Sequence, residues 1–172
     1  MRYLTVIRHA KAVPAAPGQA DEDRPLAPRG RRQCAWLRER ALDPEGLGAY
    51  GPARVLVSAA RRTRETYGAA LEFTPFVAQA VVERAIYNGR REVSAADLLD
   101  VLRAIDDETT SLAVVGHNPT VFEFVIAVAT HPPAALRDDR YPLAGAIVLA
   151  VPGPGPVTGG PYDVVAVFAP PA

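Results

Sequence analysis

The 172-residue sequence has little cysteine and no long hydrophobic run. The first feature argues against a disulfide-stabilised secreted protein, and the second argues against a protein that spans a membrane. Because Cys34 is the single cysteine, no internal disulfide can form, which favours a reducing compartment. No segment approaches the ~18 consecutive apolar residues that cross a bilayer. The N-terminus also lacks the apolar stretch and small-residue cleavage site of a signal peptide. We therefore expect a cytoplasmic protein with no membrane contact.

The chain also has no excess of charge of either sign, because it contains 19 basic and 19 acidic residues. This balance argues against wholesale electrostatic capture of nucleic acid or of an anionic membrane. All basic residues except Lys11 are arginines, so an isolated arginine is no evidence of a site. The length and the 49% hydrophobic content predict one globular domain, residues 1–172, with a substantial core.

Apolar runs rich in β-forming residues alternate with helical patterns along most of the chain. Ser94 and Asp97 are spaced as a capping box, and Asn118 with Pro119 is typical of a helix start. Strands that alternate with helices predict an α/β fold with a mainly parallel sheet covered on both faces. The last two runs suit an antiparallel addition, joined by a surface loop at Pro152–Pro161. The predicted strands are Tyr3–Ile7, Ala53–Val57, Phe76–Val82, Leu112–Val115, Ala146–Val151 and Tyr162–Phe168.

Three of these strands end on polar clusters. The first ends on Arg8 and His9, the second leads into residues 58–64 (SAARRTR), and the fourth leads into His117 and Asn118. The carboxyl ends of parallel strands share one edge of a sheet, so the clusters are expected to converge there. Guanidinium groups bind phosphate oxygens bidentately, and a helix N-terminus adds backbone N–H donors. Histidine can serve as nucleophile or as proton donor near neutral pH, so the pattern predicts a phosphate site.

Each cluster alone has a simpler interpretation. A single histidine at a strand end is more often a hydrogen-bonded structural residue, and an arginine-rich segment is more often a solvated helix face. Metal binding by His9 and His117 is weakly supported, because no third histidine or thiolate stands at a spacing that completes tetrahedral ligation. Three clusters at three strand ends favour the phosphate site over these readings. We predict no metal and no cofactor.

Four segments resemble the histidine phosphatase superfamily, which has the phosphoglycerate mutase-like fold. They are RHA at residues 8–10, RPLAPRG at 24–30, LVSAARRTRET at 56–66 and VVGHNP at 114–119, in the order of the family. The resemblance implies a three-layer α/β/α sandwich over the chain. The small size and the RPL…RG segment are most similar to the SixA-like branch, which dephosphorylates phosphohistidine on proteins.

The resemblance also implies roles for individual residues. His9 matches the nucleophile that becomes phosphorylated, and Arg8 matches the phosphate ligand beside it. Ser58 matches the serine that opens the family's second motif and is expected among the phosphate-binding residues. When Ser58 is aligned with the motif's serine, Arg62 matches its phosphate-binding arginine, and Arg61 is a less well matched alternative.

The second pocket histidine of the family matches His117, followed by Asn118 as a further phosphate-binding position. The implied mechanism is metal-independent: neutral His9 attacks phosphorus while the arginines and a protonated His117 hold the phosphoryl oxygens. A neutral nucleophile and a cationic donor together predict a bell-shaped pH profile.

The proton donor of many family members aligns with Glu83. Glu83 is therefore a candidate general acid, and the alternative is a surface carboxylate paired with Arg84 or Arg90. The chain between Val82 and Ser94 is too short for a cap, although Lys11–Arg24 suits a modest rim. We expect a phosphatase acting on protein phosphohistidine; a small-molecule phosphomonoesterase of the same fold and a non-catalytic phospho-ligand binding module stay as alternatives. The sequence does not determine the oligomeric state.

Overall fold

Six strands form one sheet in a computed structural model that describes residues 2–89, 91–105, 111–153 and 157–171. The strand order is β3-β2-β4-β1-β5-β6. Pairing is parallel for β1 with β4 and for β2 with both β3 and β4, and antiparallel for β5 with β1 and β6. The sheet is therefore mostly parallel, with an antiparallel pair at one side. The strands are β1 (Arg2–Arg8), β2 (Arg54–Ser58), β3 (Gln79–Glu83), β4 (Ser111–Gly116), β5 (Ala146–Val151) and β6 (Asp163–Phe168).

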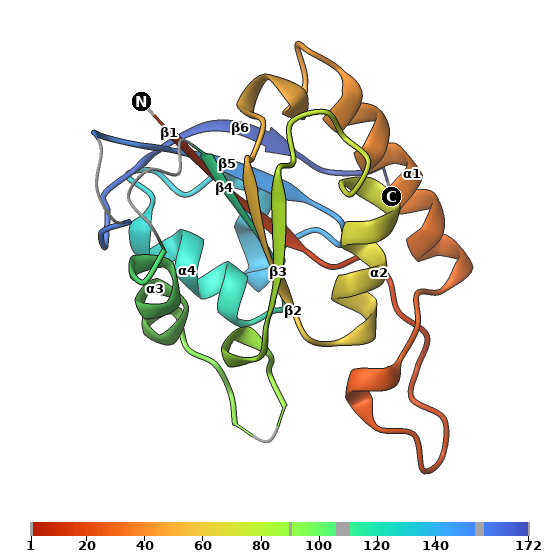
Figure 1. Ribbon diagram of the computed structural model, residues 1–172. Coiled ribbons are helices and arrows are strands. Elements are labelled where there is room, and N and C mark those ends of the chain that lie inside the picture. The colour runs from red at the N-terminus through yellow and green to blue at the C-terminus, as the bar shows by residue number, and fades with distance from the viewer. Residues whose placement is uncertain (1, 90, 106–110, 154–156, 172) are drawn as a thin grey trace.

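Helices cover both faces of this sheet (Figure 1). Side chains of α3 (Ala95–Arg103) and α4 (Thr120–Val128), such as Leu98 and Phe124, pack in one core cluster with Leu4 of β1. Side chains of α1 (Pro28–Leu42) and α2 (Arg61–Ala70) pack on the other face. Since successive strand residues point to opposite faces, β1 supplies both clusters. The predicted three-layer α/β/α architecture is confirmed.

The order and type of the predicted strands are confirmed, with boundaries that differ by a few residues. The capping box is also confirmed: the Ser94 side chain accepts from the N–H of Asp97, whose carboxylate accepts from the N–H of Ser94. The fourth helix begins at Thr120 rather than at Asn118, after a turn closed by the bond from the N–H of Val121 to the carbonyl of His117. Of the predicted loop Pro152–Pro161, residues 154–156 lie outside the described residues.

Short 3-10 helices complete the connections that matter for the site. η1 (Asp21–Asp23) lies in the segment between β1 and α1, next to α2 (Figure 1). η3 (Arg84–Ile86) directly follows β3. None of the described helices combines the length and apolar character needed to cross a bilayer.

Candidate active site

The carboxyl ends of β1 and β4 meet at a pocket of about 310 Å³. Arg8 and Gly116 are paired in the last register position of these strands, so His9 and His117 follow as neighbours. Their ring centroids lie 5.1 Å apart. The expected convergence of the polar strand ends is therefore observed. The lining residues are Arg8, His9, Lys11, Ala12, Arg24, Arg62, Asn88, His117, Asn118 and Leu143.

One ring nitrogen of His9 is tied to the backbone. Nδ1 lies 2.7 Å from the carbonyl oxygen of Ala10. A carbonyl oxygen can only accept a hydrogen bond, so Nδ1 carries the proton in the neutral ring. This tautomer leaves the lone pair on Nε2, on the opposite side of the ring. His9 thus has the form that a nitrogen nucleophile requires.

The ring of His117 is held by a buried hydroxyl. Its Nε2 lies 2.8 Å from Oγ of Ser58, and both residues are buried. Ser58 therefore stands behind His117 rather than among the residues that line the pocket. Three buried polar atoms at the site, Arg8 Nε, His117 Nδ1 and Asn118 Oδ1, have no hydrogen-bond partner among the described residues. Unpaired buried polar atoms are costly, and all three belong to residues that line this pocket, so its wall holds polar groups that the fold leaves unpaired.

The guanidinium of Arg62 is held by Asp21, forty-one positions earlier in the chain. Nη1 donates to the Asp21 carbonyl at 2.8 Å, and Nη2 donates to its carboxylate at 2.9 Å. Arg24 donates to the other carboxylate oxygen at 2.7 Å, and the Tyr87 hydroxyl donates to Asp21 Oδ2 at 3.3 Å. Asp21 thus fixes the orientation of two arginines that line the pocket.

Burial alone would raise the pKa of the Asp21 carboxyl. The hydrogen bond from Arg24 and the charge of Arg62 outweigh burial and hold this pKa below its usual value. Asp21 is therefore a carboxylate at neutral pH and not a proton donor.

Two contacts fix the chain that follows His9. The N–H of Ala10 donates to the Thr66 hydroxyl, which donates to the carbonyl of Arg62, so β1 is joined to α2. The N–H of Lys11 donates to Oε1 of Gln33 at 3.0 Å. Gly30 lies so close that an added Cβ would stand 2.1 Å from the Lys11 carbonyl oxygen. A glycine is therefore required there, and the pocket wall is pinned to α1.

Both pocket histidines are neutral in the ligand-free protein. Burial lowers the pKa of His9 to about 3, against the raising effect of its bond to Ala10, and the charge of Arg62 lowers it further. Burial, the neighbouring His9 and Arg62 together lower the pKa of His117 to about 2. The cationic His117 expected from the sequence is thus not its state in the free protein. The cause is desolvation among positive charges, which disfavours a further cation until an anion binds.

These pKa shifts predict how stability depends on pH. In the unfolded chain both histidines titrate near pH ~6.5, so below that pH they bind protons that the folded protein does not bind. Stability is therefore complete above pH ~6.5 and falls as the pH drops toward the folded-state pKa values. The loss reaches up to ~1.4 kcal/mol per pH unit for each histidine.

Replacing His117 by glutamine removes one of these titrations and keeps a polar partner for Ser58. We expect urea unfolding at pH 6.5, 5.5 and 4.5 to give a shallower loss of stability for H117Q than for wild type. H131Q is the control, because His131 is exposed. Equal slopes for H117Q and wild type would contradict the assignment of a neutral, buried His117.

Most of the site residues predicted from the sequence lie at the pocket, and Glu83 does not. His9, Arg8, Arg62, His117 and Asn118 line the pocket, and Ser58 contacts it through His117. Among the described residues, the pocket lining does not include Glu83, whose carboxylate instead accepts from the N–H of Ala85 at 2.8 Å. Its possible partner Arg90 lies outside the described residues.

Other residues at the site carry no signal in the sequence. Asn88 and Tyr87 come from the connection after β3, and nothing in their spacing points to the pocket. Asp21 lies within the rim expected from residues 11–24, but the sequence gives no sign of its contact with Arg62. Lys11 and Arg24 belong to the rim expected from residues 11–24, and both line the pocket. Within the described part of the chain, no group of three or more His, Cys, Asp or Glu side chains is arranged to hold a metal ion.

No family model matches the chain. The uncharacterized protein Rv1276c of Mycobacterium tuberculosis is 36% identical over 155 residues, which cover 86% of this chain and 88% of the relative. The candidate phosphohistidine phosphatase SixA of Agrobacterium tumefaciens has a solved structure that is 27% identical. It superposes with a TM-score of 0.76 over 98% of this chain and 99% of that chain. This chain belongs to the histidine phosphatase superfamily.

A second solved member supports the same branch of the superfamily. The candidate SixA of Nakamurella multipartitia is 25% identical and has a TM-score of 0.74, covering 99% of this chain and 97% of that chain. The resemblance to the SixA-like branch is thus confirmed over nearly the whole length. Both of these solved structures are described as phosphatases, which supports a phosphohydrolase activity for this chain, with the phosphate pocket expected at the carboxyl ends of β1 and β4.

Proposed function

We propose that this histidine phosphatase removes the phosphoryl group from phosphohistidine on proteins, with His9 as nucleophile. The observation that carries the proposal is the fixed tautomer of His9, whose Nδ1–H donates to Ala10 and leaves Nε2 free to attack. Arg8, Arg62 and His117 border the same pocket and suit the three phosphoryl oxygens.

In the first step, the lone pair of His9 Nε2 attacks phosphorus. The bond from phosphorus to the substrate imidazole breaks, and its electron pair becomes the lone pair of the leaving nitrogen. When the other ring nitrogen of the phosphohistidine carries a proton, the ring leaves as neutral imidazole and needs no further proton. Arg8 and Arg62 hold the oxygens as charge moves between them, and each such donor is worth about 3 kcal/mol. Phosphate charge beside His117 favours its protonated form, which restores the cationic donor that burial removes from the free protein.

In the second step, water attacks the phosphorylated His9 and releases inorganic phosphate. The Nδ1 proton of His9 stays on its bond to the Ala10 carbonyl throughout, so the phosphorylated ring is an imidazolium. An imidazolium departs as a neutral ring, which makes it a good leaving group. The backbone bond thus favours both formation and hydrolysis of the intermediate.

The proposed preference for phosphohistidine follows from the pocket lining, which contains no aspartate or glutamate among the described residues. An alkyl phosphate leaves as a strongly basic alkoxide and needs a proton donor, whereas an imidazole leaves far more easily. Asp21, the carboxylate that lies against Arg62, is held in its charged form. The Glu83 carboxylate accepts a backbone hydrogen bond after β3. This arrangement suits a substrate that needs little acid catalysis.

Turnover of matched substrates tests the proposal. We expect the wild-type protein, in the presence of a chelator, to dephosphorylate a phosphohistidine peptide and phosphoimidazole faster than alkyl phosphates. The E83Q variant is expected to change phosphohistidine turnover by less than about tenfold, or ~1.4 kcal/mol in the barrier. If Glu83 does protonate alkoxides, alkyl phosphate turnover falls by ~10²-fold or more in E83Q.

Two results would overturn this substrate assignment. Vigorous turnover of one alkyl phosphate, with none of phosphohistidine, would make the protein a small-molecule phosphomonoesterase. Binding of phosphate without turnover of any substrate would make it a phospho-ligand binding module.

A further inference from the structure

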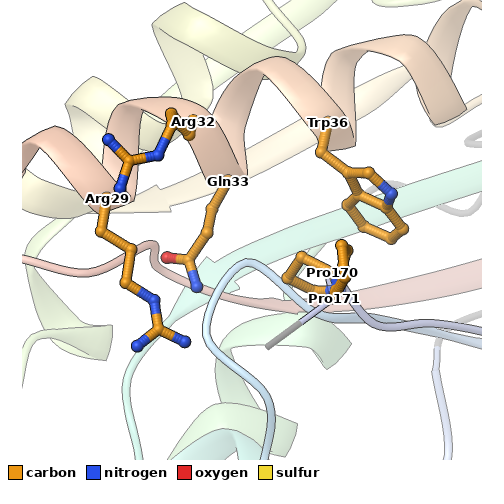
Figure 2. Close-up of a pocket in the computed structure, with 6 residues that line it drawn as sticks. All are labelled: Arg29, Arg32, Gln33, Trp36, Pro170 and Pro171. Atoms are coloured by element: carbon orange, nitrogen blue, oxygen red, sulfur yellow. The ribbon is translucent and has the colours of Figure 1, made fainter.

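A second pocket, of about 480 Å³, lies on α1 and is larger than the catalytic pocket. Figure 2 shows Gln33 and Trp36 leaving the helix toward Pro170 and Pro171, which form the facing wall, with Arg29 on the far side of Gln33. Arg29, Arg32, Gln33 and Trp36 are spaced i, i+3, i+4 and i+7, so they form one stripe along the helix. We call this stripe and the two prolines the α1 groove.

The α1 groove is basic in a chain of zero net charge. α1 carries five arginines and one acidic residue, Glu39, so the remainder of the chain has an acidic excess. Arg29 and Arg32 are exposed, and the ion pairs found in the described part of the chain include neither of them. Their charge is therefore available to a partner and is not consumed within the fold.

The groove also has an apolar part. Trp36, the only tryptophan, is half-buried and stands beside the two prolines (Figure 2). Tryptophan and arginine are the residues most enriched at the energetic centres of protein interfaces. An apolar side chain flanked by carboxylates would match this combination.

The α1 groove and the catalytic pocket are linked by one hydrogen bond between residues of their walls. Gln33 lines the groove, and its Oε1 accepts from the N–H of Lys11, which lines the catalytic pocket. A phosphorylated side chain that enters the pocket therefore brings the neighbouring surface of its protein onto α1.

We propose that the α1 groove docks the phosphoprotein substrate itself, through an acidic segment beside the phosphohistidine. Arg29 and Arg32 pair with its carboxylates, and Trp36 with the prolines receives an apolar side chain. The proposal rests on the function proposed above and adds the class of surface that the enzyme selects. Charge complementarity of this kind raises association rates and suppresses wrong partners more than it raises affinity.

Phosphohistidine peptides of about 15 residues, which extend over up to ~50 Å, provide the test. One peptide carries Asp, Glu and one Leu around the phosphohistidine, a second carries Lys in place of the acids, and phosphoimidazole serves as a substrate without flanks. We expect wild type to favour the acidic over the basic peptide by at least roughly tenfold in kcat/KM at low salt, with most of the difference in KM. Added salt should reduce this preference.

The double variant R29E/R32E is expected to lose or invert the preference, while its turnover of phosphoimidazole changes less than about twofold. The matched control is R31E/R64E, which alters two exposed arginines outside the groove and changes the net charge equally. The control should keep the preference. W36A should lower kcat/KM for the acidic peptide when its Leu is present and have no effect when Leu is replaced by Gly.

Failure of the docking proposal differs from failure of the proposed function. Equal rates on both peptides by wild type, or equal loss of preference in both double variants, would overturn docking at the α1 groove and leave the phosphatase intact. No turnover of any phosphohistidine substrate, with rapid turnover of phosphoesters, would instead overturn the proposed function and the docking with it.

Discussion

Replacement of His9 by alanine should abolish catalysis. The neighbouring groups that we propose bind phosphate stay in place, but no other described side chain of the pocket lining offers a neutral nitrogen with the same backbone support. Removing a covalent nucleophile from an enzyme costs many orders of magnitude, so we expect kcat to fall by about 10⁴-fold or more on an aryl phosphate. Steady-state rates on wild type and H9A, with a correction for spontaneous hydrolysis, measure the effect.

The alanine variant should still bind phosphate, since the two arginines and His117 remain. A titration with inorganic phosphate therefore separates loss of the nucleophile from loss of the fold. H131A is the matched control and is expected to keep wild-type turnover, because His131 is exposed. Retention of more than about one hundredth of the wild-type kcat in H9A would mean that another group attacks phosphorus.

The second large effect concerns two adjacent arginines. Arg62 lines the pocket with its side chain only 7% exposed, and it is held by Asp21. Arg61 has a side chain that is 50% exposed and pairs with Glu65 at 2.6 Å. Loss of one preorganised donor costs ~10² to 10³-fold, so we expect R62A to lose that factor in kcat/KM while R61A loses less than about threefold.

The R61A variant is itself the control for this comparison, because both substitutions remove one arginine from the first turn of α2. R62K tests the role of the planar guanidinium, and it should recover only part of the loss, since lysine cannot bind phosphate bidentately. A larger loss in R61A than in R62A would show that the pocket uses the other arginine.

The sheet and the strand ends were predictable because local patterns determine them. A continuous apolar run such as residues 112–115 is typical of a strand whose two faces are both covered, and alternation with helices favours parallel pairing of such strands. Once the sheet is parallel, the residues after β1 and β4 must meet at one edge. His9 and His117 could therefore be placed together although they are 108 positions apart.

The role of Asp21 could not be predicted, since it depends on the path of a connection. Asp21 lies in a run of three acidic residues that reads as a solvated loop, and only the folded position of η1 brings it to Arg62. The charge of His117 also could not be predicted, because burial lowers its pKa and the spacing of residues in a sequence does not reveal how deeply one side chain is buried. Cys34, by contrast, stands at helical spacing with Leu37 and Ala41, a pattern that predicts a core residue. It is buried, and burial raises the pKa of its thiol to about 11.

Direct detection of a phosphoenzyme tests the central claim, that His9 carries the phosphoryl group during turnover. The protein is mixed briefly with labelled phosphoramidate, denatured and digested, and the labelled peptide is identified by mass spectrometry. We expect label on the peptide that contains His9, lost in acid and stable in base, and absent from H9A. Label of the same amount in H9A, or label that survives acid and sits on another residue, would contradict the account.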